Sequence, residues 1–424
     1  MSWARGLSGL GTSGPGGRTG GSGGAYGRLA PVPPDRRREG ARSPGAAQRR
    51  SLLRRALARN SPLRAMDWVL LVTVLALSLI GVLLVQSATR GTDPRAYIVK
   101  QLVWVVVGLV FMAVTTLLDY RQLRLYAPVL YGVSLLGLVA ALSPLGTPVN
   151  GSKSWIDLPA GLQIEPSEFA KIAIILMSAM FLSDARQGGR PQLRAAGKTA
   201  LCAVVPVLLI VKEPDLGVTI LLLVLLAGLI ALSGIRLYWL VGLAAGGALA
   251  VLAVLNLHLL KAYQLGRLTS FVNPTADPRG TGYSAAQAKI AIGSGGIFGQ
   301  GLFHGQMIAG NFVPEQHTDF IFAVAGEELG FVGAAVILAL LALLLLRALR
   351  IAARADDQFG MLVASGIAIW FAVQSFINVG MTVGIMPVTG LPLPFVSYGG
   401  SAILADMIAV GVLQAVHRHR YVFG

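Results

Sequence analysis

Residues 266–330 read GRLTSFVNPTADPRGTGYSAAQAKIAIGSGGIFGQGLFHGQMIAGNFVPEQHTDFIFAVAGEELG and form the longest interval between apolar runs outside the N-terminal arm. Turn-forming residues cluster at 273–282, whereas 285–296 is half apolar and punctuated by glycine. This pattern predicts a segment that is re-entrant rather than freely solvated. Because loops this long between packed elements are usually functional, we expect the chemistry of the protein to reside here.

The composition indicates a polytopic membrane protein. Hydrophobic residues make up 54% of the 424 residues and charged residues only 13%. The net charge of +16 is spread over the N-terminal arm and the loops, with no aromatic-interleaved basic domain, so nucleic acid is not the expected partner. The single cysteine, Cys202, excludes a disulfide framework and a thiolate metal site.

The first 64 residues are predicted to be a disordered basic arm. Gly, Ser, Pro and Arg dominate this stretch, and 13 arginines stand against two acidic residues. No apolar segment precedes a small-residue cleavage site, so it does not resemble a secretory signal, and its cations would hold it in the cytoplasm beside anionic headgroups. Residues 65–424 are expected to form the transmembrane domain.

Apolar periodicity predicts an all-α fold of about ten transmembrane helices, with a large, partly helical extracytoplasmic loop at 259–318 between the seventh and the eighth span. The predicted spans are 67–88, 98–118, 126–143, 167–183, 199–212, 215–233, 237–258, 319–346, 360–383 and 401–417. The shorter ones recruit flanking residues to cross a bilayer.

Charge asymmetry sets the predicted orientation in the plasma membrane. With ten spans, one side carries 25 lysines and arginines and the other nine, so the positive-inside rule places both termini in the cytoplasm and the 259–318 loop outside. An alternative treats the region around Glu213-Pro214-Asp215 as one broken helix. The membrane orientation of every later span would then be inverted, and five arginines at 347–354 and 418–420 would lie outside the cell.

Four charged clusters map to the predicted outer face: 153–171, 212–215, the long loop, and 387–400. Charge at this depth is costly, so each such group needs a partner or a function. The groups concerned are Glu168, Lys171, Lys212, Asp215, Asp319, Glu327 and Glu328. For Glu168, Lys171, Glu327 and Glu328, pairing across the bundle or helix capping would suffice.

Two of these clusters contain helix N-terminus signals, at Pro166-Ser167 and Pro214-Asp215. Helix starts flanked by cations form anion sites, so nearby basic residues would hold a pyrophosphate, or would simply extend to the headgroups. The basic residues are Lys153, Lys212, Arg267 and Arg279. No His or Cys spacing supports a resident metal, although a divalent cation held by carboxylates at the diphosphate is compatible with the sequence.

Asp277 differs from the other carboxylates. It lies between Pro274 and Pro278 on a turn where neither helix capping nor a bundle salt bridge is the obvious use. With Arg279 beside it and the membrane surface close by, it is placed to accept a proton from a hydroxyl nucleophile. The alternative is an aspartate favoured only by Asp-Pro turn chemistry.

Several longer strings then identify a family. They are GSKSWID at 151–157, PSEF at 166–169, PDLG at 214–217, NPTADPRGTGY at 273–283, AKIAIGSGG at 288–296, PEQHTDFIFA at 314–323, GEELG at 326–330 and MPVTGLPLPFVSYGGS at 386–401. With these strings in this order across 67–420, the chain resembles the SEDS proteins (shape, elongation, division and sporulation), and it is most similar to their RodA branch.

The resemblance implies a peptidoglycan glycosyltransferase that polymerises lipid II at the outer leaflet and releases undecaprenyl pyrophosphate. It implies that Asp277 is the essential residue, acting as general base, and that Trp155 takes part in activity. It also implies a class B penicillin-binding protein as partner, with other membrane proteins of the elongation machinery. The expected substrate-binding residues are Lys153, Trp155, Glu168, Lys171, Lys212, Asp215, Arg267, Arg279, Glu315, His317, Asp319 and Ser397.

Two alternatives use the same residues differently. A lipid II flippase would line a headgroup path with Glu168, Lys171, Glu327 and Glu328, and a non-catalytic scaffold would have no use for Asp277. The sequence also departs from the family pattern, because Glu165 and Glu213 stand where the family usually has glutamine. Both add negative charge at the predicted outer face.

Overall fold

The computed structural model describes residues 65–91, 94–149, 152–158, 162–184, 193–213, 215–234, 241–242, 245–247, 262–272 and 280–422. All of these belong to one compact unit, 55–424. The predicted arm at 1–64, most of the predicted span at 237–258 and the turn at 273–279 lie outside the described residues.

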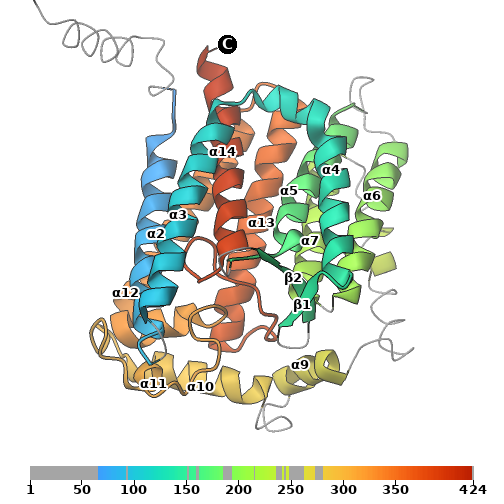
Figure 1. Cartoon of the computed structure of the whole chain (residues 1–424). Helices are drawn as coiled ribbons and strands as arrows, with labels where there is room; N and C mark the ends of the chain where they lie inside the picture. Colours follow the sequence, from blue (N-terminus) through green and yellow to red (C-terminus); the bar gives the residue numbers. More distant parts are fainter. Residues whose placement is uncertain are drawn as a thin grey trace, which may run out of the picture. The chain divides into compact units, whose positions relative to one another are not determined.

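The described part of the chain is a mostly helical membrane protein, which agrees with the predicted class except for one small sheet (Figure 1). Eight of its helices are long and apolar enough to cross a membrane, and α7 is a shorter apolar helix. The long helices are α2 (Trp68–Ala88), α3 (Pro94–Leu117), α4 (Tyr120–Leu142), α5 (Pro166–Asp184), α6 (Leu193–Lys212), α12 (Ile321–Ala353), α13 (Gln358–Val383) and α14 (Gly400–Val422), and α7 is Leu216–Leu232. The count of ten spans stays a prediction.

The region around Glu213 and Asp215 is a reversal between two helices. α6 ends at Lys212 and α7 begins at Leu216, with Asp215 as its N-cap, and the two helices pack against each other. Two packed helices joined by three residues form an antiparallel hairpin. The two predicted helices are confirmed here and the single broken helix is excluded, whereas the crossing of the membrane by α7 stays a prediction.

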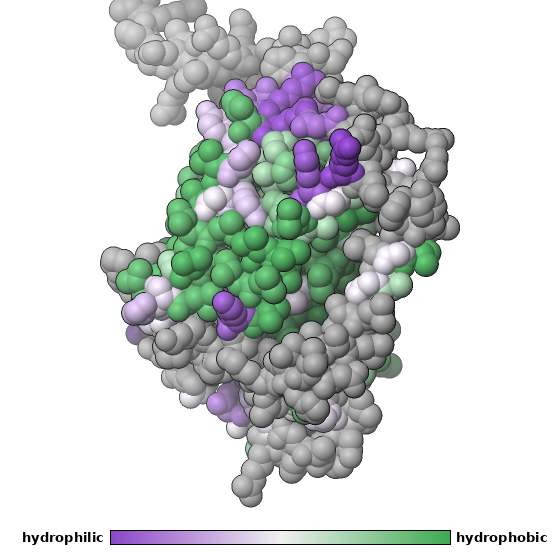
Figure 2. Space-filling model, turned by 90° about the vertical axis from the view of Figure 1, so that its right-hand side faces the viewer, coloured by the Kyte–Doolittle hydropathy of each residue, from purple (hydrophilic) through white to green (hydrophobic). Residues whose placement is uncertain are grey.

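Helix burial separates the centre of the bundle from its rim. In α14, 89% of the membrane-spanning window is buried inside the protein, whereas in α3 and α4 it is 22%. α14 packs against α3 and α5, and α13 packs against α5, α7 and α12. Figure 2 shows apolar side chains gathered over the middle of one face with polar residues above them, as expected where lipid covers the helices.

The long loop crosses one end of the bundle and is partly helical, as predicted. α9 (Ala262–Val272), α10 (Thr281–Ser294) and the short α11 (Gln306–Ala309) all lie at this end, which we call the loop end (Figure 1). α10 packs against α12 and α13, with Ala288 and Ala291 buried. This agrees with a segment packed against the protein.

A small antiparallel sheet in the order β1-β2-β3 was not predicted. Its strands are β1 (Gly146–Val149), β2 (Ser152–Leu158) and β3 (Leu162–Ile164). In its register Thr147 faces Trp155 and Ile156 faces Ile164. β3 leads almost directly into α5, so the sheet fixes where that helix begins.

The N-terminal part of α12 is hydrogen-bonded to the long loop around Gly330, where the helix is interrupted. This glycine has φ 66° and ψ −166°, which interrupts the helix. The Phe331 amide donates to the Gly296 carbonyl (2.9 Å), and the Gln300 amide donates to the Glu327 carbonyl (2.9 Å). A Cβ on Gly330 would lie 2.2 Å from the Gly299 nitrogen, so only glycine fits. These hydrogen bonds hold the loop against the bundle.

At the opposite end, Asp67 connects the first and the last described helices. Its backbone amide and carbonyl both bond the Gln414 side-chain amide (2.9 Å each). Its carboxylate caps α2 and accepts from Arg347 Nε at 2.8 Å. This Asp67 clamp joins α2, α12 and α14.

Candidate functional site

The four charged clusters singled out in the sequence converge at the loop end. The hydrogen bonds that join them run from Ser154 Oγ to the Glu213 carbonyl (3.5 Å), from Arg267 Nη1 to the Thr389 carbonyl (2.9 Å), and from Ser397 Oγ to the Thr318 carbonyl (2.6 Å). Segments that lie between 59 and 122 residues apart in the chain therefore meet here. This supports the expectation that the four clusters share one face.

A buried ion pair lies at the start of α5. Pro166 begins this helix, as the sequence predicted, and Glu168 and Lys171 follow on the face that packs inward. Lys171 Nζ lies 2.7 Å from Glu168 Oε2, and both side chains are almost fully buried. Glu168 and Lys171 therefore pair with each other, but within one helix rather than across the bundle.

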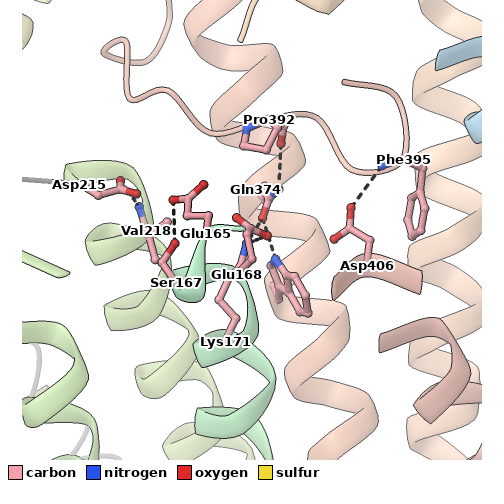
Figure 3. A network of polar contacts seen from close by, with 11 residues as sticks. Glu165, Ser167, Glu168, Lys171, Asp215, Val218, Gln374, Pro392, Phe395 and Asp406 are labelled. Carbon is pink, nitrogen blue, oxygen red and sulfur yellow. Dashed lines mark hydrogen bonds and ion pairs between the residues drawn. The ribbon is translucent and has the colours of Figure 1, made fainter. Parts of the chain in front are cut away.

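Gln374 of α13 connects this pair to the loop before α14 (Figure 3). Its side-chain oxygen accepts from Lys171 Nζ (3.1 Å) and Trp370 Nε1 (2.7 Å), and its nitrogen donates to the Pro392 carbonyl (2.8 Å). Lys171 also lies over the Trp370 ring, 4.6 Å from its centroid. The lysine is therefore held by a carboxylate, an amide and an aromatic face.

Two further carboxyls flank the ion pair on the side of α7. Asp215 accepts from the Val218 amide (3.0 Å) as the N-cap of α7, and Glu165 accepts from Ser167 Oγ (2.8 Å). Burial, and then the Glu168 and Asp215 carboxylates, raise the pKa of Glu165 well above its usual range. Burial likewise raises the pKa of Asp215. Both groups can therefore carry a proton under conditions where a solvated carboxyl would be ionised.

Arg267 and Asp319 meet over Gly390. The guanidinium of Arg267, on α9, donates to the Thr389 carbonyl. A Cβ on Gly390, whose φ is +84°, would lie 3.5 Å from Asp319 Oδ2 and 3.8 Å from Arg267 Nη1. Burial and the nearby Glu315 raise the pKa of Asp319 to about 7, against the opposing effect of Arg267. This arginine fastens α9 to the 387–390 loop beside an acid that titrates near neutrality.

His317 and Ser397 form a neighbouring aromatic and turn cluster. The His317 ring meets Tyr97 edge-on at 5.1 Å between centroids and lies 5.6 Å from the Tyr398 ring. Burial lowers the pKa of His317. Ser397 accepts from the Leu393 amide (2.8 Å) while donating to the Thr318 carbonyl. Ser397 therefore holds the turn together in this structure.

Glu327 and Glu328 have structural uses, and they lie away from the Lys171 pair. Glu327 accepts from the Met307 and Ile308 amides (2.7 and 3.1 Å), and Glu328 accepts from Ser87 Oγ. Bonds to backbone amides satisfy a buried carboxylate without a cation. Glu327 and Glu328 were predicted to need a partner, and their partners are backbone amides and the Ser87 hydroxyl rather than cations.

The remaining predicted residues are more dispersed. Trp155 is half-buried in β2, Lys212 is exposed at the end of α6, and Glu315 is exposed in the turn before α12. Lys153 belongs to β2, but its side chain lies outside the described residues. Asp277 and Arg279 also lie outside them, between the end of α9 and the start of α10.

No group of three or more His, Cys, Asp or Glu side chains is placed to hold a metal ion within the described ranges. The cation at the diphosphate therefore stays a prediction.

Comparison with known proteins identifies the family. Residues 64–422 match the family model described as cell cycle protein, which covers FtsW, RodA and SpoVE. The chain belongs to the SEDS family. It is 40% identical to the peptidoglycan glycosyltransferase MrdB of Escherichia coli over 84% of this chain and 94% of that protein.

Solved structures show the same SEDS fold. A chain from a peptidoglycan synthase complex that coordinates polymerization and crosslinking is 32% identical, with a TM-score of 0.72 over 84% of this chain and 98% of that one. The rod shape determining protein RodA of Thermus thermophilus is 31% identical, with a TM-score of 0.62 and the same coverage. The predicted similarity to RodA is thereby confirmed.

Sequence reasoning missed several residues of this SEDS site. Gln374, Trp370 and Asp406 lie in apolar runs, and nothing in their local sequence marks them as partners of α5 or of the 387–400 loop. Asp406 accepts from the Phe395 amide (3.3 Å) inside the most buried helix (Figure 3). The cost of a lone acid in an apolar run is the signal that could have singled it out.

Proposed function

We propose that this chain is a peptidoglycan glycosyltransferase that polymerises lipid II, with Asp277 as general base. The observation that carries the proposal is the match to SEDS glycosyltransferases over nearly the whole transmembrane part of the chain. The convergence of four charged segments at one end of the bundle supports it, because a polymerase needs its polar groups on one face.

In the proposed reaction, the GlcNAc 4-hydroxyl of an acceptor lipid II attacks C1 of the MurNAc at the end of the growing strand. The new C1–O4 bond forms as the bond from C1 to the diphosphate oxygen breaks, with inversion giving a β-1,4 linkage. The bonding electron pair leaves with undecaprenyl pyrophosphate, and the hydroxyl proton passes to the Asp277 carboxylate. Positioning and charge stabilisation supply most of the rate.

The described side chains support such a site in two ways. Arg267, at the surface of the bundle, supplies positive charge beside the 387–390 loop. Burial raises the pKa of Glu165 and of Asp215, which lessens the tendency of these carboxyls to repel a diphosphate. We also assign Lys153, Trp155, Lys212 and Arg279 to the substrate-binding set.

The proposal includes the orientation and the partner. The chain is a multi-pass membrane protein, and we place it in the bacterial plasma membrane with both termini in the cytoplasm and the loop end outside. The similar chain in a peptidoglycan synthase complex supports a transpeptidase partner, a class B penicillin-binding protein.

Purified protein given labelled lipid II tests the proposal. We expect glycan strands from the wild-type chain and none from Asp277→Asn, with membrane insertion and partner binding unchanged. Translocation of lipid II across a vesicle without strand synthesis would instead identify a flippase. Strands from the Asp277→Asn variant would refute this aspartate as the base.

A further inference from the structure

A cleft opens at the loop end between two helices of the long loop and the segment that follows α13. Its lining residues come from three places: Arg267, Ser270 and Phe271 of α9, Ala285 and Lys289 of α10, and Gly384 with 386–388. We call it the α9–α10 cleft. It is distinct from the buried ion-pair network around Lys171.

Two cations face this cleft from different helices. Arg267 is half-buried and tied to the Thr389 carbonyl. Lys289 is exposed, and its Nζ lies 3.2 Å from the point that a Cβ on Gly384 would occupy. Within the described part of the chain, no carboxylate lies within ion-pair distance of Lys289, whereas Lys171 and Arg347 each have one.

Apart from Ser270, the rest of the cleft and its rim are apolar. Phe271, Met386 and Val388 line it, and neighbouring apolar side chains are exposed, with Ile385 at 60% and Ile290 at 53% of their surface. Two cations set in apolar surface match an amphiphile that carries a compact negative charge. A soluble anion would have no use for the apolar rim.

The two helices that line the cleft are also the ones that bracket Asp277 in the sequence. α9 ends at Val272 and α10 begins at Thr281, so the intervening residues start and finish at the two helices that line it.

From these observations we infer that the α9–α10 cleft binds the diphosphate of a polyprenyl-linked molecule, with Lys289 as a ligand-holding cation and Arg267 on the opposite wall. This rests on the proposed function for the identity of the ligand. The diphosphate belongs either to lipid II or to the undecaprenyl pyrophosphate that leaves. Lys289 also lies beside the C-terminal end of α13, where a cation can stabilise the helix dipole, so its test must separate binding from stability.

The test measures binding by the full-length protein in detergent micelles. Undecaprenyl pyrophosphate, lipid II and phosphatidylglycerol are titrated separately onto the wild type, Lys289→Met, Lys289→Arg and the control Lys198→Met, which removes an exposed lysine from α6. We expect Lys289→Met to bind undecaprenyl pyrophosphate about ten-fold more weakly, as for the loss of one charge-assisted contact. Lys289→Arg and Lys198→Met should bind as the wild type does, and the melting temperatures should be equal.

Each outcome decides the inference. A ten-fold loss for undecaprenyl pyrophosphate alone assigns the cleft to the leaving group, and an equal loss for lipid II assigns it to the substrate diphosphate. Unchanged binding in Lys289→Met, or an equal loss for phosphatidylglycerol, overturns it even if the wild type makes strands. If the wild type makes no strands but Lys289 still controls binding, the proposed function fails and the cleft remains a polyprenyl diphosphate site.

Discussion

Replacing Lys171 with methionine should destabilise the protein more than any surface charge change. The ammonium lies 2.7 Å from Glu168 Oε2, with side-chain exposures of 0% and 2%. Breaking a buried pair by removing one partner costs about 3–5 kcal/mol, because the other charge is left uncompensated. The substitution also removes the contact with the Trp370 ring and the hydrogen bond to Gln374.

A double-mutant cycle isolates the pair. Glu168→Gln alone should also cost several kcal/mol, whereas Lys171→Met with Glu168→Gln removes both charges and should lie within about 2 kcal/mol of the wild type. The free energy of unfolding is measured by denaturant titration in mixed micelles. The control pair is Arg121 and Asp357, which are more exposed and 3.9 Å apart, and whose coupling should be under about 1 kcal/mol.

The coupling energy between Lys171 and Glu168 decides whether the stability contributed by each residue depends on the other. A value of about 3 kcal/mol or more supports a pair that is both buried and mutually dependent. A value below about 1 kcal/mol, equal to that of the surface control, would show that the two groups reach other partners or water, and the reasoning would be refuted.

Three further predictions concern the loop end. Lys153→Ala should weaken lipid II binding more than turnover, and an unchanged apparent affinity in steady-state kinetics would count against it. Burial and Asp215 raise the pKa of Glu213 to about 8; since the folded state then binds the proton more tightly than the unfolded state, stability should fall as pH rises from about 4.5 to 8. Glu213→Gln should remove the contribution of this one group to the slope, leaving those of Glu165, Asp215 and Asp319, and should add about 3 kcal/mol near pH 7, which pH-dependent unfolding would check. Gly330→Ala should cost about 3 kcal/mol or more because its Cβ would meet the Gly299 nitrogen, whereas Gly234→Ala, at a similar positive φ with nothing within 4 Å, should cost about 1–2 kcal/mol in thermal unfolding.

The sequence predicted those parts of the fold that depend on local pattern. Apolar runs located the helices, and Pro166 and Asp215 marked two helix starts, because span length and capping are properties of short stretches. α12 extends from 321 to 353 rather than from 319 to 346, and it is interrupted at Gly330, which the apolar pattern did not indicate. The small sheet was missed, although Asn150-Gly151 between β1 and β2 is a hairpin signal that could have found it.

The site was predictable only in part. Glu168, Lys171 and Asp319 were singled out because they lie in or beside apolar segments. A buried charge there costs free energy unless it is paired or has a function. The identity of each partner depends on packing between distant segments. Nothing near Lys171 in the sequence points to Gln374, which lies 203 residues away. The same holds for Arg267 and Thr389, 122 residues apart.

The Asp67 clamp makes completion of the bundle depend on the order of synthesis. Asp67 begins the first described helix, but its backbone partner, Gln414, belongs to the last one, 347 residues later. Until the ribosome has delivered α14, the amide and carbonyl of Asp67 lack their partner at the membrane boundary. A chain truncated before Gln414 would therefore leave these backbone groups of Asp67 without their partner at the start of α2, and quality-control proteases would meet a product that is incomplete at the Asp67 clamp as well as at its C-terminal end.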